Sequence, residues 1–139
     1  MAEGLFLYHL RNLSVLEKFE VDSCGTGGWH SGETADRRML KTAEKNGITL
    51  THRARQLKKT DMDAFDYILV MDHQNLRDVL SLYPDHAHKV KLLTEFSTHH
   101  KNQIIPDPYF GSDGDFDDVY ELLNQVTLQV AHHLVQKHL

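Results

Sequence analysis

The single cysteine of the 139-residue chain, Cys24, is the one thiol that could act as a nucleophile. A glycine-rich stretch follows it, and then come His30, which can carry a positive charge, and Ser31. A thiolate that attacks a bound oxyanion needs a bidentate Arg clamp, whereas His30 offers one contact that depends on pH. No helix is expected to begin straight after Ser31, so no helix N-terminus would face an anion there. We therefore interpret Cys24 as a small, partly buried residue.

An aspartate followed by proline, Asp107-Pro108, is a second candidate for chemistry. Proline restricts the preceding residue to an extended backbone, which would aim the Asp107 carboxyl into a cleft rather than into a helix. On these two residues alone, a solvated turn is the simpler interpretation. The 11 His residues include close pairs, but neither Cys nor carboxylate completes them at finger-like spacing. We interpret the histidines as solvated side chains and expect no metal site.

Length and composition limit what the chain can be. At 139 residues it suggests one domain, residues 1–139, and 40% apolar with 25% charged residues is typical of a globular protein with a core. A net charge of -5 gives no cationic field for nucleic acid or anionic lipid, so neither partner is favoured. One cysteine excludes an internal disulfide, and neither a membrane span nor a signal peptide is evident. We expect a cytoplasmic protein, with its oligomeric state left open.

The hydrophobic pattern predicts alternating helices and strands. Helices are expected at residues 2–13, 36–46 and 76–83 and from about 115 onwards, and strands at residues 19–23, 67–71 and 90–93. The continuous apolar run at 67–71 is typical of a parallel strand buried on both faces, and Asp72 after it is expected to cap the next helix. The alternation predicts an α/β fold that binds ligands at the carboxyl ends of parallel strands. Such a fold normally begins with a strand, so the helix at residue 2 suggests that a piece is missing.

Six short segments, spread along the whole chain, together form a recognisable pattern. They are Met1-Ala2-Glu3-Gly4-Leu5-Phe6, Val21-Asp22-Ser23 with Gly25-Thr26-Gly27-Gly28-Trp29, His52-Arg53-Ala54-Arg55-Gln56, Phe65-Asp66-Tyr67-Ile68-Leu69, Met71-Asp72 with Asn75-Leu76-Arg77-Asp78, and Asp107-Pro108-Tyr109. In this order and spacing they resemble the low-molecular-weight protein-tyrosine phosphatases. The resemblance implies a Rossmann-like α/β sandwich with a parallel sheet. It also implies hydrolysis of phosphotyrosine through a cysteinyl-phosphate, without metal or other cofactor.

The sequence departs from that family at its start. In the family, a strand and a loop of Cys, five residues, Arg and then Ser or Thr come directly before Met-Ala-Glu-Gly, and the 139 residues hold no counterpart. That loop cradles a phosphate with backbone N–H groups, clamps it with Arg and attacks it with the Cys thiolate. The resemblance also places this strand in the middle of the sheet. Its absence would expose apolar faces and remove several kcal/mol of stability.

The resemblance assigns the other half of the site to residues that are present. Asp107 matches the general acid that protonates the leaving tyrosine oxygen and then helps to activate water. Ser23 and His52 match residues that hold the phosphate loop through hydrogen bonds. If either were buried without that loop, its polar group would lack a partner, which costs about 1–3 kcal/mol of stability. Arg55 is interpreted as structural. The aromatic side chains that match the lining of the substrate cleft are Trp29, Tyr109 and Phe110.

Three hypotheses remain open. The first is an N-terminally truncated phosphatase domain that is inactive as it stands, whose complete form acts on phosphotyrosine proteins or aryl phosphates. The second is a non-catalytic pseudophosphatase that binds a protein partner through the residual cleft. The third gives Cys24 residual phosphatase activity, which requires that Cys24→Ser abolish turnover.

Overall fold

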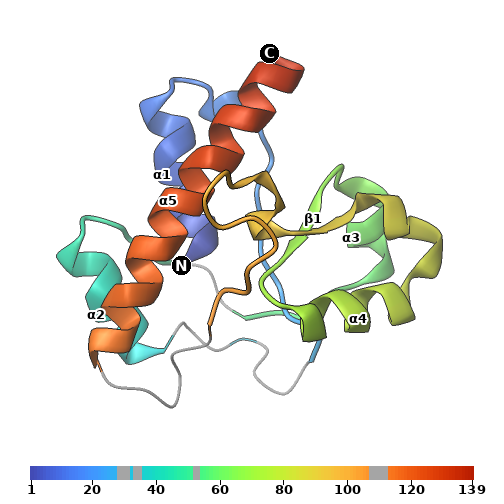
Figure 1. The fold of residues 1–139 in the computed structure, drawn as a ribbon, viewed down its shortest axis with the longest axis horizontal. Helices are drawn as coiled ribbons and strands as arrows, with labels where there is room; N and C mark the ends of the chain where they lie inside the picture. Colours follow the sequence, from blue (N-terminus) through green and yellow to red (C-terminus); the bar gives the residue numbers. More distant parts are fainter. Residues whose placement is uncertain (28–31, 33–35, 52–53, 107–112) are drawn as a thin grey trace.

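The computed structural model describes residues 1–27, 32, 36–51, 54–106 and 113–139 (Figure 1). The α-helices described are α1 (Ala2–Asn12), α2 (Arg37–Lys45), α3 (Lys59–Ala64), α4 (His73–Leu82) and α5 (Asp113–His138). Short 3-10 helices are η1 (Leu16–Lys18), η2 (Pro84–Lys89) and η3 (Leu93–Phe96), and the strands are β1 (Ile68–Val70) and β2 (Val90–Leu92). Within these described parts, no helix is both long and apolar enough to cross a membrane.

Local signals explain where α2 and α4 begin. The Asp36 carboxylate accepts a hydrogen bond from the Arg38 N–H at 2.8 Å, and α2 ends before Gly47, whose φ of +78° suits glycine. The Asp72 carboxylate accepts from the Asn75 N–H at 2.7 Å and begins α4. The prediction that Asp72 caps this helix is therefore confirmed.

The sheet within the described residues consists of β1 and β2 alone. The two strands pair in parallel, with Ile68 opposite Val90 and Val70 opposite Leu92, and α4 makes the crossover between them. The prediction of a strand at residues 19–23 is wrong. The backbone is extended at Phe19, with φ -127° and ψ 141°, but no strand among the described residues lies beside this segment to form a ladder. An isolated parallel bridge between Gly25 and Gln56 follows it.

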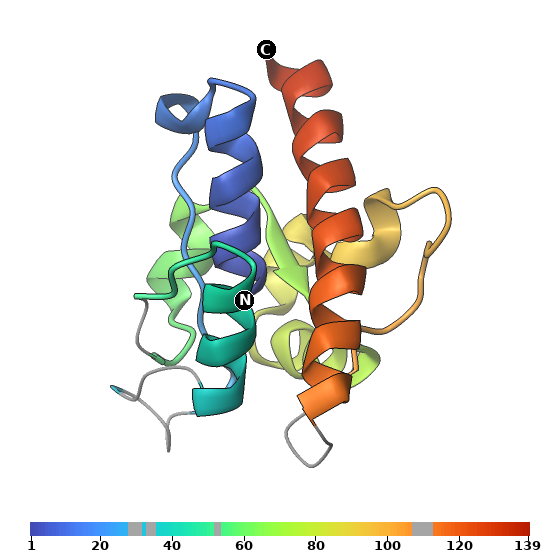
Figure 2. The same ribbon diagram turned by 90° about the vertical axis from the view of Figure 1, so that its left-hand side faces the viewer.

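Strand β1 separates two apolar clusters. Ile68 and Val70 belong with the cluster of α3, α4 and β2, whereas Leu69 and Met71 pack against the cluster of α1, α2 and α5. Figure 2 shows α1 alongside α5, with β1 between them in that view. These helical layers on both faces of a parallel sheet are the α/β sandwich expected from the sequence.

Helix α5 buries the face that the sequence predicted. The α5 residues expected on the buried side are buried except for the half-buried Leu122: Phe116, Val119, Leu123, Val126, Val130 and Leu134.

Strand β1 is less buried than its continuous apolar run predicts. Val70 is buried, but Ile68 and Leu69 are half-buried because a groove opens along the free edge of the strand.

Candidate active site

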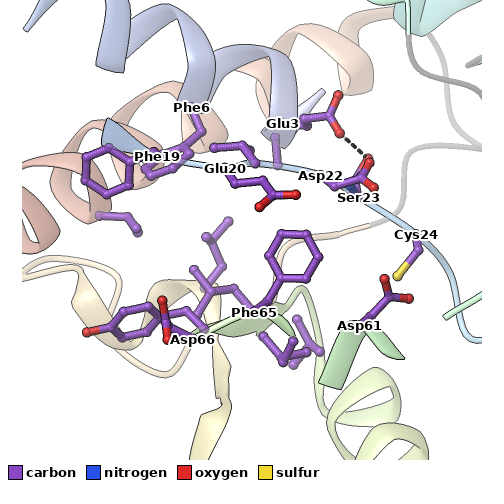
Figure 3. Close-up of a pocket in the computed structure, with 18 of the residues that line it drawn as sticks. Glu3, Phe6, Phe19, Glu20, Asp22, Ser23, Cys24, Asp61, Phe65 and Asp66 are labelled. Carbon is purple, nitrogen blue, oxygen red and sulfur yellow. Dashed lines mark hydrogen bonds between the residues drawn. The ribbon is translucent and has the colours of Figure 1, made fainter. Parts of the chain in front are cut away.

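A groove with a cavity volume of about 630 Å³ runs along the free edge of β1. Residues 18–26 form one wall and residues 64–71 form the other, with side chains of α1 and α5 and of the region of α3 and α4 between them. Figure 3 shows the two walls facing each other, with Phe19 near one end and Cys24 at the other. The sequence predicted a ligand site at the carboxyl ends of the strands, whereas this groove follows β1 along its whole length.

Ser23 lies on the first wall and has a partner there. Its hydroxyl donates a hydrogen bond to Oε1 of Glu3, in the first turn of α1, at 3.0 Å (Figure 3). Ser23 is half-buried, so the expected cost of an orphaned hydroxyl does not arise. This bond ties the wall of the groove to the start of α1.

Arg55 is held between two carboxylates beside the groove. Its Nη1 and Nη2 donate to Oδ2 and Oδ1 of Asp61 at 2.8 and 3.0 Å, and its Nε and Nη2 donate to Oδ2 of Asp22 at 3.1 and 2.9 Å. Asp61 also accepts from the Lys58 N–H at 2.8 Å and thereby begins α3. The guanidinium is therefore committed to structure, as the sequence indicated, and not free to clamp a phosphate.

These contacts shift the pKa values of the groups involved. The hydrogen bonds from Arg55 hold the pKa of Asp61 below its ordinary 3.8, against the opposing effect of burial, and the Lys58 N–H adds to the lowering. The hydrogen bond to Asp61 likewise raises the pKa of Arg55, against desolvation. Both groups are thus charged at neutral pH, and their pairing stabilises the folded state there.

Replacing Arg55 tests this pairing. We expect Arg55→Ala to lower the free energy of unfolding at pH 7 by about 2 kcal/mol, because buried Asp61 keeps its charge and loses its main partner. The folded-state pKa of Asp61 lies below 3.8, so the stabilisation is present above that pH and is lost as the pH falls through the folded value. Urea denaturation at pH 7 and at pH 3 should therefore show a difference from wild type that shrinks in acid.

A matched ion pair on the surface provides the control. Lys45 Nζ lies 2.7 Å from Oδ1 of Asp117, but both side chains are largely exposed. Lys45→Ala should change stability by less than about 0.5 kcal/mol. An Arg55→Ala effect as small as this, or one that persists undiminished at pH 3, would contradict the account.

Cys24 lies at the end of the groove, and Figure 3 shows its sulfur directed towards Asp61. The residue is exposed, not partly buried as expected, because no strand in the described part of the chain covers its segment. Local desolvation raises the pKa of the thiol above its ordinary 9.0; Arg55 lowers it, but Asp61 and Asp22 oppose that effect. The thiol is therefore protonated at neutral pH, unlike the thiolate of an activated nucleophile.

The segment that precedes residue 107 is anchored to the carboxyl end of β1. The Ile105 N–H donates to the Met71 carbonyl at 2.8 Å, and the Thr94 hydroxyl donates to the Gln103 carbonyl at 2.5 Å. Pro106, the last residue described before the gap, follows Ile105 directly. The remaining predicted site residues lie outside the described residues: Trp29, His52, Asp107, Tyr109 and Phe110.

Sequence reasoning gave no role to Glu3, Glu20 or Asp61, which also line the groove. A signal for Asp61 was present, since an acid three residues after a helix N-cap commonly reaches back to the cap N–H. The Glu3 contact with Ser23 joins residues 20 apart, and no local pattern predicts it.

Comparison with known proteins agrees with this α/β architecture. A family model described as low molecular weight phosphotyrosine protein phosphatase matches residues 1–139. The low molecular weight phosphotyrosine protein phosphatase 1 of Drosophila melanogaster is 41% identical over 124 residues, 87% of this chain and 79% of that protein. The Schizosaccharomyces pombe low molecular weight phosphotyrosine protein phosphatase is 39% identical over 122 residues, 86% of this chain and 78% of that protein.

Solved structures give the same result. The crystal structure of a protein tyrosine phosphatase from Entamoeba histolytica, with Hepes in its active site, matches with a TM-score of 0.93 and 30% identity. The match covers 99% of this chain and 89% of that one. The fold is the α/β fold of the phosphatase structures that it matches. The chain belongs to the low-molecular-weight phosphotyrosine protein phosphatase family.

Proposed function

We propose that these 139 residues carry the acid-bearing half of a phosphotyrosine phosphatase site and do not hydrolyse phosphotyrosine by themselves. The observation that carries the proposal is family membership over residues 1–139 together with a single cysteine that no Arg follows at the family's spacing. Cys24 does not take the role of the family's loop cysteine, because its pKa is raised and Arg55, which lowers this pKa, is already held by Asp22 and Asp61.

In a complete site, which includes the family's loop of Cys, five residues and Arg, the thiolate of the loop cysteine attacks phosphorus and forms a cysteinyl-phosphate. The bond from phosphorus to the tyrosine oxygen breaks, and Asp107 transfers its proton to that oxygen as it leaves. Asp107, now a carboxylate, takes a proton from water as the water oxygen attacks phosphorus. The cysteine leaves as a thiolate, and inorganic phosphate is released.

The described residues support this assignment of Asp107. The hydrogen bond from Ile105 to Met71 brings the chain, up to Pro106, to the carboxyl end of β1. Active sites of parallel sheets lie at the carboxyl ends of the strands. We propose that Trp29, Tyr109 and Phe110 line the cleft for a phenyl phosphate, and that Ser23 and His52 hold the family's phosphate-binding loop. The chain is proposed to act as one cytoplasmic domain, residues 1–139.

Turnover of p-nitrophenyl phosphate and of a phosphotyrosine peptide tests the proposal. We expect neither wild type nor Cys24→Ser to exceed the rate in buffer, because the Cys24 thiol is protonated and Arg55 beside it is already paired with two carboxylates. Turnover by the wild type that Cys24→Ser abolishes would instead support the third hypothesis, in which Cys24 is the nucleophile.

A non-catalytic role as a partner-binding pseudophosphatase is the second candidate. The observation in its favour is that the described residues retain two clusters of buried apolar side chains, one on each side of β1. Such a binder must fold on its own. Cooperative unfolding in urea is what this candidate requires, and a molten or aggregating chain would exclude it.

A further inference from the structure

The bond between Asn46 and Gly47 joins the pair of residue types that most favours deamidation of asparagine. In that reaction the backbone nitrogen of the following residue attacks the side-chain carbonyl carbon, and glycine hinders the attack least because it has no Cβ. Asn46 is also exposed. The other four asparagines of the chain precede leucine or glutamine: Asn12, Asn75, Asn102 and Asn124. The sequence therefore makes Asn46 the most reactive asparagine.

Residues 43–48, the α2 cap, close the C-terminus of α2 in a Schellman motif. The Ile48 N–H donates to the Ala43 carbonyl at 2.8 Å, and the Gly47 N–H donates to the Glu44 carbonyl at 3.0 Å. Gly47 has a φ of +78°, the left-handed conformation that this motif requires. In the closed cap, the nitrogen that would attack Asn46 is therefore held as a hydrogen-bond donor.

The side chain of Asn46 is held in the cap as well. Its Nδ2 donates to the Thr42 carbonyl at 2.8 Å, and the ψ of Asn46 is 12°. To bring the Gly47 nitrogen onto the Asn46 Cγ, this ψ has to rotate and the hydrogen bonds of Nδ2 and of the Gly47 N–H have to break. The closed cap therefore blocks the reaction, and a local opening of the cap permits it.

The α2 cap also supports the start of α1. Ile48 is buried and belongs to the apolar cluster of α1, α2 and α5. A Cβ built on Gly4 would lie 3.1 Å from Cγ2 of Ile48 and 2.6 Å from Cδ2 of Leu50, so the first turn of α1 lies directly against these side chains. The same turn carries Glu3, which accepts the hydrogen bond from Ser23. An open cap would loosen the packing of this turn.

We propose that Asn46 is a site of spontaneous deamidation, that it reacts when the α2 cap opens locally, and that the product keeps the cap open. In the opened cap, the Gly47 nitrogen bonds to Cγ of Asn46 and loses its proton, Nδ2 leaves as ammonia with that proton, and a cyclic imide remains. Water then adds to one of the two imide carbonyl carbons, and the bond from that carbon to the Gly47 nitrogen breaks. Breakage at Cγ gives aspartate, and breakage at the main-chain carbonyl gives isoaspartate. Overall, water is consumed and ammonia is released, without oxidation or reduction.

Either product disfavours the closed cap. A carboxylate has no N–H group to donate to the Thr42 carbonyl, and it places negative charge at the C-terminal end of α2, which the helix dipole disfavours. Isoaspartate also lengthens the main chain, which disturbs the spacing of the two Schellman hydrogen bonds. The inference goes beyond the catalytic proposal, because the reaction needs water alone and no part of the phosphatase site.

Peptide mass spectrometry over a time course of incubation at pH 8 tests the gating by the fold. A peptide of residues 43–50, Ala-Glu-Lys-Asn-Gly-Ile-Thr-Leu, gives the unprotected rate in buffer and in urea. We expect Asn46 of the folded 139-residue protein to react at least about tenfold more slowly than this peptide, and to match the peptide in urea that unfolds the protein. Product should form at Asn46 well before it forms at the exposed Asn102. Equal rates in the folded protein and the peptide would overturn the gating.

Two truncations in the core separate local opening from global unfolding. Ile48→Ala removes a buried side chain of the α2 cap, and the rate at Asn46 should rise about tenfold. Val79→Ala is the matched control, since Val79 is buried in the other apolar cluster, and it should leave this rate unchanged. Equal acceleration by both variants would show that Asn46 reacts from the unfolded chain, which contradicts the proposal.

Amide hydrogen exchange tests the effect of the product. Asn46→Asp reproduces the aspartate product, and residues 43–48 should then exchange about three- to tenfold faster than in wild type. Asn102→Asp is the control, because Asn102 is exposed and lies outside the helices, and it should leave exchange at residues 43–48 unchanged. Unchanged exchange in Asn46→Asp would refute the claim that the product keeps the cap open. None of these readouts involves phosphate, so they are independent of whether the phosphatase proposal is correct.

Discussion

Adding the family's strand and Cys-x5-Arg loop ahead of Met1 should yield a protein that hydrolyses phenyl phosphate, and Asp107→Asn should then lower its kcat about 10²–10³-fold. Phenolate is a poor leaving group, so its departure depends on a proton from the general acid. The loss should be smaller for p-nitrophenyl phosphate, whose leaving group needs less protonation. Steady-state kinetics with the two substrates measures both effects.

Asp85→Asn is the control for this prediction. Asp85 is an exposed carboxylate in η2, and its replacement should leave kcat unchanged for both substrates. If Asp107→Asn retains the full rate with phenyl phosphate, Asp107 is not the acid. If the completed protein has no activity at all, the proposed catalytic half-site is wrong.

The same addition should raise the free energy of unfolding by about 3–5 kcal/mol. The added strand buries apolar side chains in the groove and pairs with residues 20–24 and β1, and these gains exceed the backbone entropy lost on ordering it. Since more surface is exposed when the larger structure unfolds, the m-value in urea should rise as well. Equilibrium urea denaturation of the two proteins measures both quantities.

Two variants of the added segment separate packing from chemistry. Replacing its cysteine with serine should preserve the added stability while removing turnover, because the strand is unchanged. A proline in the middle of the strand should remove most of the added stability, since it deletes a ladder donor. An addition that leaves the unfolding free energy and m-value unchanged would show that the strand does not occupy the groove.

Elements defined by local patterns could be predicted from the sequence. The α5 face that carries Val126 and Val130 and the cap at Asp72 depend on residues close in the chain, and both are as predicted. Strands β1 and β2 were also predicted from two short apolar runs on either side of a helix, and the structure shows that they pair with each other in parallel. The family assignment rested on motifs in order along the chain, and the comparisons confirm it.

Features that depend on distant partners could not be predicted. Residues 19–23 alternate like a strand, but a strand also needs a neighbour, and no described segment supplies one. The exposure of Cys24 has the same cause. The clamp of Arg55 by Asp22 and Asp61 joins three segments whose contact depends on the tertiary fold. The contact of Ser23 with Glu3 likewise escaped prediction.

Catalysis, as proposed above, requires a second cysteine, and these 139 residues contain Cys24 alone. Rapid quenching in acid, followed by peptide mass spectrometry, locates the phosphoenzyme after mixing with a phosphotyrosine peptide. The 139-residue protein and the completed protein should be compared in parallel. We expect phosphate on the added cysteine of the completed protein and none on Cys24 in either protein. Phosphate on Cys24 of the 139-residue protein would contradict this expectation.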